Sequence, residues 1–297
     1  MEKIILFCKS YDKDMLRARR MAESVLRFNV DSISLYFCVP AQDLAAFQEC
    51  LGAIPCFFLT DEDILFQTSR RYGELPKLFP FHLMQQLMKL EFWRMGLCEN
   101  YVWLDSDSYF IRPFSLADFF ADGQTPYTVM HDNSELLDFA RRMGRQKISD
   151  DFKKMASRMQ EAFGRVGDVV DFGYPPLIWS SKVLQSLDEY LRQHRKTIYD
   201  LLMAYPCEMQ IYGEYLLFSK VIPLIPKDPL FKFYHYAEQF YDDQERGESD
   251  YSLAVRYAGV VIQSNWARVP GPKRPTKERL KRFFQKVVSQ IRGLFLC

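Results

Sequence analysis

Short apolar runs alternate with amphipathic segments from the first residues of the chain, and this alternation restricts the fold more than any other feature. Residues 3–11 (KIILFCKSY), 32–40 (SISLYFCVP) and 54–65 (IPCFFLTDEDIL) are rich in side chains that are typical of buried strands. Residues 12–29 and 41–51, which separate them, place apolar side chains at helical spacing. This order predicts an α/β fold in which helices cover a largely parallel sheet.

Another apolar run, YVWLDSDSYFIRPF at residues 101–114, ends in two aspartates, Asp105 and Asp107. Nearly continuous apolar character predicts a strand buried on both faces, and ligands of open α/β sheets bind at the carboxyl ends of strands. In an extended chain the two carboxylates would point to the same side and repel each other unless a cation lay between them. Mg²⁺ or Mn²⁺, with substrate phosphates as further ligands, suits such a place. The alternative is a turn, in which Asp and Ser are common.

The same run resembles the D-x-D region of GT-A-fold nucleotide-sugar glycosyltransferases, and within them bacterial polysaccharide and lipopolysaccharide biosynthesis enzymes with an LDSD…RPF signature. The order of the other segments extends the resemblance over residues 1–268. It implies a GT-A-like, Rossmann-type mixed sheet flanked by helices. It also implies transfer of a sugar from a nucleoside diphosphate sugar to a surface-glycan or lipid-linked acceptor, with Mn²⁺ or Mg²⁺ on the donor diphosphate.

Two further segments are similar to donor-binding elements of that family. KSYDKDM places Ser10 and Tyr11 after the first strand, where a nucleotide would lie. HLMQQLMKLEFWR places Gln85 and Lys89 four residues apart on one helix face, and the resemblance implies that both face the donor. The alternatives are an ordinary loop for the first pair and solvated surface for the second.

Carboxylates later in the chain are candidates for the general base that inverting transfer to a hydroxyl requires. Glu208 and Glu214 lie in CEMQIYGEY, which is similar to an acceptor-side element of the family. Glu208 is preferred, although a Glu at a helix start also serves as a cap. Asp171 is a further candidate for acceptor contact. A retaining mechanism would need no base of this kind, and the sequence leaves both outcomes open.

Many GT-A enzymes add a late His or Asn to the metal ligands, and the resemblance puts His235 or Asn265 in that role. The alternative for the histidine is an ordinary surface or core position. None of the four histidines has the spacing of a zinc site, so we do not expect zinc.

The last part of the chain differs from the rest in charge. Residues 273–297 contain eight lysines and arginines against one glutamate, whereas the whole chain has a net charge of +1, so residues 1–272 are acidic. We expect a linker at 269–276 and a basic amphipathic helix at 277–297 that lies on a membrane surface. The alternative is a helix docked on its own domain. The apolar stripe consists of Leu280, Phe283, Phe284, Val287, Val288, Ile291, Leu294 and Phe295.

These observations predict a cytoplasmic enzyme that is peripheral on the inner face of the cell membrane. Seven cysteines without CxxC pairs are typical of reduced thiols. The sequence contains no run of about 18 apolar residues, so we expect no membrane-spanning helix. Two other functions stay open: a metal-dependent phosphohydrolase or nucleotidyltransferase, and a non-catalytic adaptor that works through the basic tail. We do not expect nucleic-acid binding, because the body is acidic and the basic residues share a helix with large apolar ones.

Overall fold

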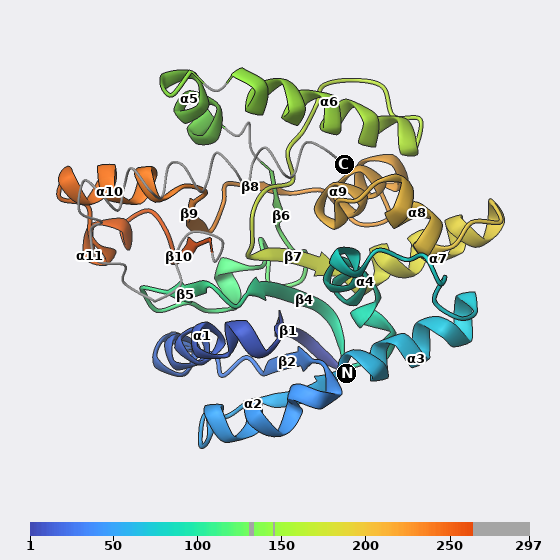
Figure 1. The fold of residues 1–297 in the computed structure, drawn as a ribbon, viewed down its shortest axis with the longest axis horizontal. Coiled ribbons are helices and arrows are strands. Elements are labelled where there is room, and N and C mark those ends of the chain that lie inside the picture. Colours follow the sequence, from blue (N-terminus) through green and yellow to red (C-terminus); the bar gives the residue numbers. More distant parts are fainter. Residues whose placement is uncertain (131–133, 145, 264–297) are drawn as a thin grey trace.

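The computed structural model describes residues 1–130, 134–144 and 146–263, and within them a five-stranded mixed sheet forms the centre of the fold (Figure 1). The strand order is β3-β2-β1-β4-β7. The first four of these strands are parallel, and β7 is antiparallel to β4. The predicted α/β fold with a mixed sheet is confirmed. The strands are β1 (Glu2–Lys9), β2 (Leu35–Val39), β3 (Phe57–Thr60), β4 (Cys98–Asp105) and β7 (Leu177–Ser180).

The register of the parallel strands brings their carboxyl ends to one edge. Lys9 is paired with Cys38 on one side and with Asp105 on the other. Val39, one residue beyond Cys38, is paired with Thr60 at the end of β3. The loops that follow β1 and β4, and the helix that begins at Asp61 directly after β3, therefore meet at this edge, which is where a ligand is expected to bind.

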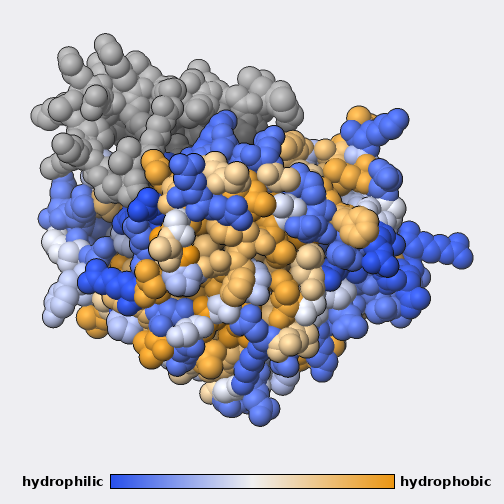
Figure 2. Space-filling view, turned by 90° about the horizontal axis from the view of Figure 1, so that it is seen from below, coloured by the Kyte–Doolittle hydropathy of each residue, from blue (hydrophilic) through white to orange (hydrophobic). Residues whose placement is uncertain are grey.

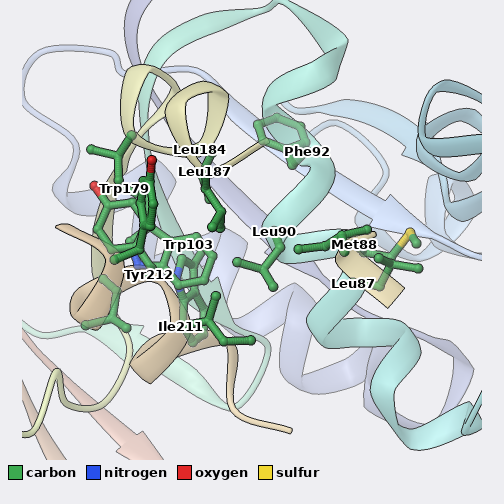
Figure 3. Close-up of a cluster of buried hydrophobic side chains, with 14 of the residues drawn as sticks. Leu87, Met88, Leu90, Phe92, Trp103, Trp179, Leu184, Leu187, Ile211 and Tyr212 are labelled. Atoms are coloured by element: carbon green, nitrogen blue, oxygen red, sulfur yellow. The ribbon is translucent and has the colours of Figure 1, made fainter. Parts of the chain in front are cut away.

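Alternate side chains of the sheet feed two separate cores, as the period of two in a strand requires. Ile5, Phe7, Tyr101 and Trp103 face one core, while their neighbours in sequence face the other. Figure 3 shows the first core, where Trp103, Trp179 and Tyr212 lie together beside Leu90. The helices that contribute to this core are α3 (Asp61–Tyr72), α4 (Met84–Glu91), α6 (Gln146–Ala162), α7 (Ser181–Gln193), α8 (Ile198–Ala204) and α9 (Glu208–Ser219).

The second core is closed by two helices and by a smaller sheet of order β5-β10-β9. In that sheet β10 is antiparallel to β5 and parallel to β9. The elements are α1 (Met15–Phe28), α2 (Leu44–Leu51), β5 (Ser108–Phe110), β9 (Phe231–Tyr234) and β10 (Gly259–Ile262).

Several shorter elements complete the described part of the chain. A two-stranded sheet joins β6 to β8 in parallel, and α5 and α6 lie on its far side from the main sheet (Figure 1). The elements are β6 (Thr128–Val129), β8 (Pro226–Lys227), α5 (Ser134–Arg142), α6 (Gln146–Ala162), α10 (Ala237–Glu245) and α11 (Asp250–Leu253), with 3₁₀ turns at Asp12–Asp14, Ala41–Asp43, Phe81–Leu83, Phe92–Met95 and Leu116–Asp118.

Two predictions from local pattern are corrected by the structure. IPCFFLTDEDIL at 54–65 predicts a strand followed by a turn, but α3 begins directly after β3, because Thr60 and Asp63 form a reciprocal capping box. The apolar spacing of residues 182–205 predicts a single helix, but the structure has two, α7 and α8. The break falls at Arg195, whose φ is +53°, and Thr197 caps the second helix.

Figure 2 shows the molecule from below, where apolar surface lies among charged side chains. Phe57 on the edge strand β3 and Phe66 on α3 are more than half exposed. Within the described residues, no helix is both long and apolar enough to cross a bilayer. The expected linker at 269–276 and amphipathic helix at 277–297 lie outside the described residues.

Candidate functional site

Asp105 ends β4 at the ligand-binding edge of the sheet, and Lys89 holds its carboxylate. Asp105 has the same parity as Tyr101 and Trp103, so its side chain points to the face that α4 covers. Lys89 Nζ, on α4, donates to Asp105 Oδ1 at 3.1 Å. Lys89 is thus buried rather than solvated, and it lies against the D-x-D segment.

The same ammonium group also contacts Glu208, the first residue of α9. Lys89 Nζ lies 3.3 Å from Glu208 Oε1 and 3.7 Å from the centre of the Trp103 ring. Burial alone would lower the pKa of Lys89, but the carboxylates of Asp105 and Glu208 outweigh it and raise the pKa. Lys89 is therefore a fixed cation that joins α4, β4 and α9.

Asp107 lies in a turn between two sheets. β4 ends at Asp105 and β5 begins at Ser108, so the chain is not extended between the aspartates, and that part of the expected geometry is wrong. Ser108 Oγ donates to the backbone oxygen of Asp105 at 2.7 Å, which tightens the turn. The backbone oxygen of Asp107 accepts from Ile262 N of β10 at 3.1 Å.

The charges of both aspartates nevertheless affect the same group, the thiol of Cys8 on the neighbouring strand β1. Burial raises the pKa of Cys8, and the charges of Asp105 and Asp107 add to that rise, while Lys89 and Lys9 oppose it. The D-x-D segment thus places two negative charges beside the end of β1.

The residues after β1 differ in exposure. Ser10 is 2% exposed, its backbone N–H donates to Cys38 O, and within the described residues its buried hydroxyl has no hydrogen-bond partner. Tyr11 is 43% exposed at the rim of the same edge. Gln85 is exposed, one helical turn before Lys89. Ser10 and Lys89 are thus buried, whereas Tyr11 and Gln85 lie on the surface.

Asp171 lies beside the start of α9. Its Oδ1 accepts from Gln210 Nε2 at 3.3 Å and from Gly173 N at 3.0 Å. Burial raises the pKa of Cys207 to about 12, and the charges of both Glu208 and Asp171 contribute to the rise. Asp171 and Glu208 therefore flank the same helix start, as two acceptor-side candidates should.

Glu214 is placed differently. It is fully buried on α9 and forms a two-point ion pair with Arg165, in which Arg165 Nη2 lies 3.0 Å from Glu214 Oε1. The structure does not bring Glu214 to the cluster around Lys89.

His235 follows β9 at the same end of the small sheet as Asp107. Tyr234 of β9 is paired with Ile262 of β10, whose N–H reaches Asp107, so His235 lies about two strand spacings, roughly 10 Å, from Asp107. Its ring lies 4.4 Å from the ring centres of both Tyr174 and Phe233. Asn265 lies outside the described residues.

The donor set fits a hard divalent cation that shares its shell with a substrate. Within the described ranges no group of three or more His, Cys, Asp or Glu side chains is arranged to enclose a metal ion. Mg²⁺ and Mn²⁺ do not need such a cage when phosphate oxygens complete the shell, and one or two carboxylates then suffice. The Asp105 side chain is 35% exposed, which leaves its carboxylate accessible from solvent.

Sequence reasoning missed two neighbours of this cluster. The sequence places Trp103 in a buried strand, and the structure shows that its ring faces Lys89. Asp14 falls in the segment 12–29 with helical spacing, and in the structure it is 9% exposed and pairs with Arg17 at 2.6 Å. Burial raises the pKa of Asp14 against the effect of Arg17, and Asp105 contributes to the rise. The strand parity of Trp103 with Asp105 was a usable signal.

The fold is shared with a known glycosyltransferase. Mouse xyloside xylosyltransferase 1, in its apo form, superposes with a TM-score of 0.50 and 10% identity, covering 89% of this chain and 99% of that one. At this identity the likeness concerns the fold, which is GT-A-like. A comparison with curated proteins finds no match. The sequence profile of DUF6492, a family of unknown function, matches residues 4–259, and the chain therefore belongs to that family.

Proposed function

We propose that this protein is a metal-dependent glycosyltransferase that moves a sugar from a nucleoside diphosphate sugar to a glycan or lipid-linked acceptor. The observation that carries the proposal is the cluster of Lys89, Asp105 and Glu208 at the carboxyl edge of a GT-A-like sheet, with Asp107 in the adjoining turn. It combines two carboxylates suited to a divalent cation with a buried lysine suited to phosphate.

Each residue of the cluster has a role in this proposal. Asp105 and Asp107 would hold Mn²⁺ or Mg²⁺, which when bound stabilises the negative charge that develops on the leaving nucleoside diphosphate. Lys89 supplies a second positive charge to the same phosphates, and its two carboxylate partners keep it protonated. Ser10 offers a buried hydroxyl at the end of β1, and Tyr11 and Gln85 line the rim.

Glu208 and Asp171 are the proposed acceptor-side carboxylates. Glu208 is 6% exposed and lies beside the donor cluster, and Asp171 is 7% exposed and oriented by Gln210. In an inverting reaction one of them would take the proton of the attacking hydroxyl. In a retaining reaction Glu208 would instead orient Lys89 and the sugar. His235, Asn265 and Glu214 remain candidates from sequence, the first two as metal ligands and the third as a base.

The proposal is tested by a donor screen. Thermal unfolding is measured with Mn²⁺ and a panel of nucleoside diphosphate sugars, because a ligand that binds only the folded state raises Tm. We expect at least one donor to stabilise the wild type and to be hydrolysed slowly, and Asp105→Asn and Asp107→Asn to abolish both effects. Asp138→Asn is the matched control, because Asp138 pairs with Arg141 on an exposed helix face.

Product analysis separates the alternatives. A transferred or hydrolysed sugar with intact nucleoside diphosphate supports the glycosyltransferase, whereas release of phosphate or a nucleotidyl product supports the phosphohydrolase or nucleotidyltransferase. If no donor shifts Tm and both aspartate variants behave as the wild type, the proposal is wrong.

We also propose that residues 277–297 hold the protein on the inner face of the cell membrane, with residues 269–276 as the linker. The support is the apolar stripe and the excess of lysine and arginine in the sequence. Sedimentation with anionic and with neutral vesicles tests it. We expect the full chain to pellet with anionic vesicles and to stay in solution at high salt or when residues 269–297 are removed.

A further inference from the structure

Lys89 forms a salt bridge with Asp105, the carboxylate that the proposed function assigns to a metal ion. Its ammonium lies 3.1 Å from Asp105 Oδ1, within hydrogen-bonding distance and close enough for strong mutual attraction. We propose that Lys89 competes with the divalent cation for Asp105, so that metal binds weakly by itself and tightly only together with a nucleoside diphosphate. This inference rests on the proposed function and concerns the control of its site.

The surroundings of Lys89 allow it to release Asp105 without losing all its partners. Glu208 Oε1 is 3.3 Å away and is almost completely buried, and the Trp103 ring lies 3.7 Å away. A lysine that turns from Asp105 keeps one charged partner and one aromatic face. The cost of a buried, unpaired ammonium therefore does not arise.

The difference in exposure between Asp105 and Glu208 determines which carboxylate an incoming metal ion reaches. The Asp105 side chain is 35% exposed, whereas those of Lys89 and Glu208 are 6% and 8% exposed. A cation that arrives from solvent reaches Asp105 first, while Lys89 stays on the inner side with Glu208. The phosphates of a nucleotide would then meet two cations, the metal and Lys89, at one edge of the sheet.

This arrangement predicts coupling between the two ligands. Without a nucleotide, metal binding must break the pair between Lys89 and Asp105 and places two cations near each other. With a diphosphate present, its negative charge compensates both cations. The lysine would thus disfavour metal binding in the absence of the donor.

The test measures Mn²⁺ binding directly, from the loss of the electron paramagnetic resonance signal of free Mn²⁺, with no reaction taking place. Wild type and Lys89→Met are titrated alone and with UDP or GDP. We expect Lys89→Met to bind Mn²⁺ by itself at least about tenfold more tightly than the wild type, and to gain less from the nucleotide.

Lys9→Met is the matched control. Lys9 is as buried as Lys89, is paired in register with Asp105 on the next strand, and binds Asp61 at 3.0 Å. The Lys9→Met variant removes one positive charge, as Lys89→Met does, but leaves the pair between Lys89 and Asp105 in place. We therefore expect its affinity for Mn²⁺ to change by less than about threefold, as for a screened interaction at longer range. If Lys9→Met tightens Mn²⁺ binding as much as Lys89→Met, net charge explains the effect and the inference is wrong.

Glu208→Gln provides an independent arm, because it keeps the lysine and removes its other charged partner. The whole attraction of Lys89 then falls on Asp105, and we expect weaker Mn²⁺ binding than in the wild type. Glu208→Gln therefore also tests the competition if Lys89→Met does not fold.

The outcomes separate the inference from the proposed function. If the wild type binds Mn²⁺ with UDP or GDP but Lys89→Met binds it no more tightly alone, the competition is disproved and the proposed function stands. If neither protein binds Mn²⁺ with or without a nucleotide, the metal-dependent function itself fails.

Discussion

The ring of Phe172 lies directly against the backbone of Gly213 in α9. A Cβ atom at residue 213 would come within 2.0 Å of the Phe172 ring, so the close packing requires glycine. Phe172 follows Asp171, and α9 begins with Glu208, so this contact sets the distance between the segment of one acceptor-side candidate and the helix of the other.

We therefore expect Gly213→Ala to destabilise the protein by about 1–3 kcal/mol, as overpacking does, although alanine usually stabilises a helix interior. Chemical denaturation measures the free energy of unfolding. The double variant Phe172→Ala with Gly213→Ala should lose less stability than the sum of the two single losses, because the smaller side chain leaves room for the new methyl group. Additive losses would contradict the contact.

Asp188 joins three elements through one carboxylate. It accepts from Arg71 and Tyr72 of α3 and from Arg94, and these donors outweigh burial and hold the pKa of Asp188 below its usual value. Among the described residues, Asp188→Ala leaves Arg94 with Glu91 as its one acidic partner, and we expect the free energy of unfolding to fall by about 3 kcal/mol or more. Thermal and chemical denaturation check this. Asp138→Ala, on an exposed helix pair, should cost less than about 0.5 kcal/mol.

Glu91 makes stability depend on pH. Burial raises its pKa to about 7, against the opposing effects of Arg94 and Thr68. An acid whose pKa is higher in the folded state contributes stability below the unfolded value, about 4.5, and loses it as the pH rises through about 7. We expect the wild type to lose stability between about pH 4.5 and 7 relative to Glu91→Gln, which cannot titrate there. Parallel pH profiles of the two proteins would contradict the assignment.

Glu214 allows folding and catalysis to be told apart. Its carboxylate is fully buried and bound by Arg165, away from Lys89, so we expect Glu214→Gln to lower the free energy of unfolding by about 1–3 kcal/mol while donor hydrolysis persists in the folded fraction. Glu208→Gln should show the reverse, a large loss of turnover with a smaller loss of stability. Loss of turnover in Glu214→Gln at unchanged stability would instead support Glu214 as the base.

The parts of the fold that follow from local pattern were predictable. Apolar runs predicted β1, β2, β3 and β4, because strands buried in a sheet consist mostly of apolar residues. The helical spacing of apolar residues after residue 12 predicted α1. The split between α7 and α8 was not predictable from apolar spacing, which continues through it. It depends on the backbone of Arg195 and the cap at Thr197.

The site was predictable as a place but not as a set of contacts. The position of Asp105 at a strand end follows from the sequence, since parallel strands share their carboxyl edge. That Lys89 pairs with Glu208, 119 residues later, depends on how α4 and α9 pack side by side on β4. The sequence favours Glu208 over Glu214 only by its place at a helix start, whereas the ion pair between Glu214 and Arg165, which separates their environments, depends on packing.

The hydrogen bond between Ile262 N and Asp107 O has a practical use in magnetic resonance. It places Gln263, which is partly exposed, beside the proposed metal ligands, although more than 150 residues separate them in the chain. A fluorine-labelled side chain at residue 263 would thus report the occupant of the site from its line width. Paramagnetic Mn²⁺ would broaden that signal, and diamagnetic Mg²⁺ would leave it sharp.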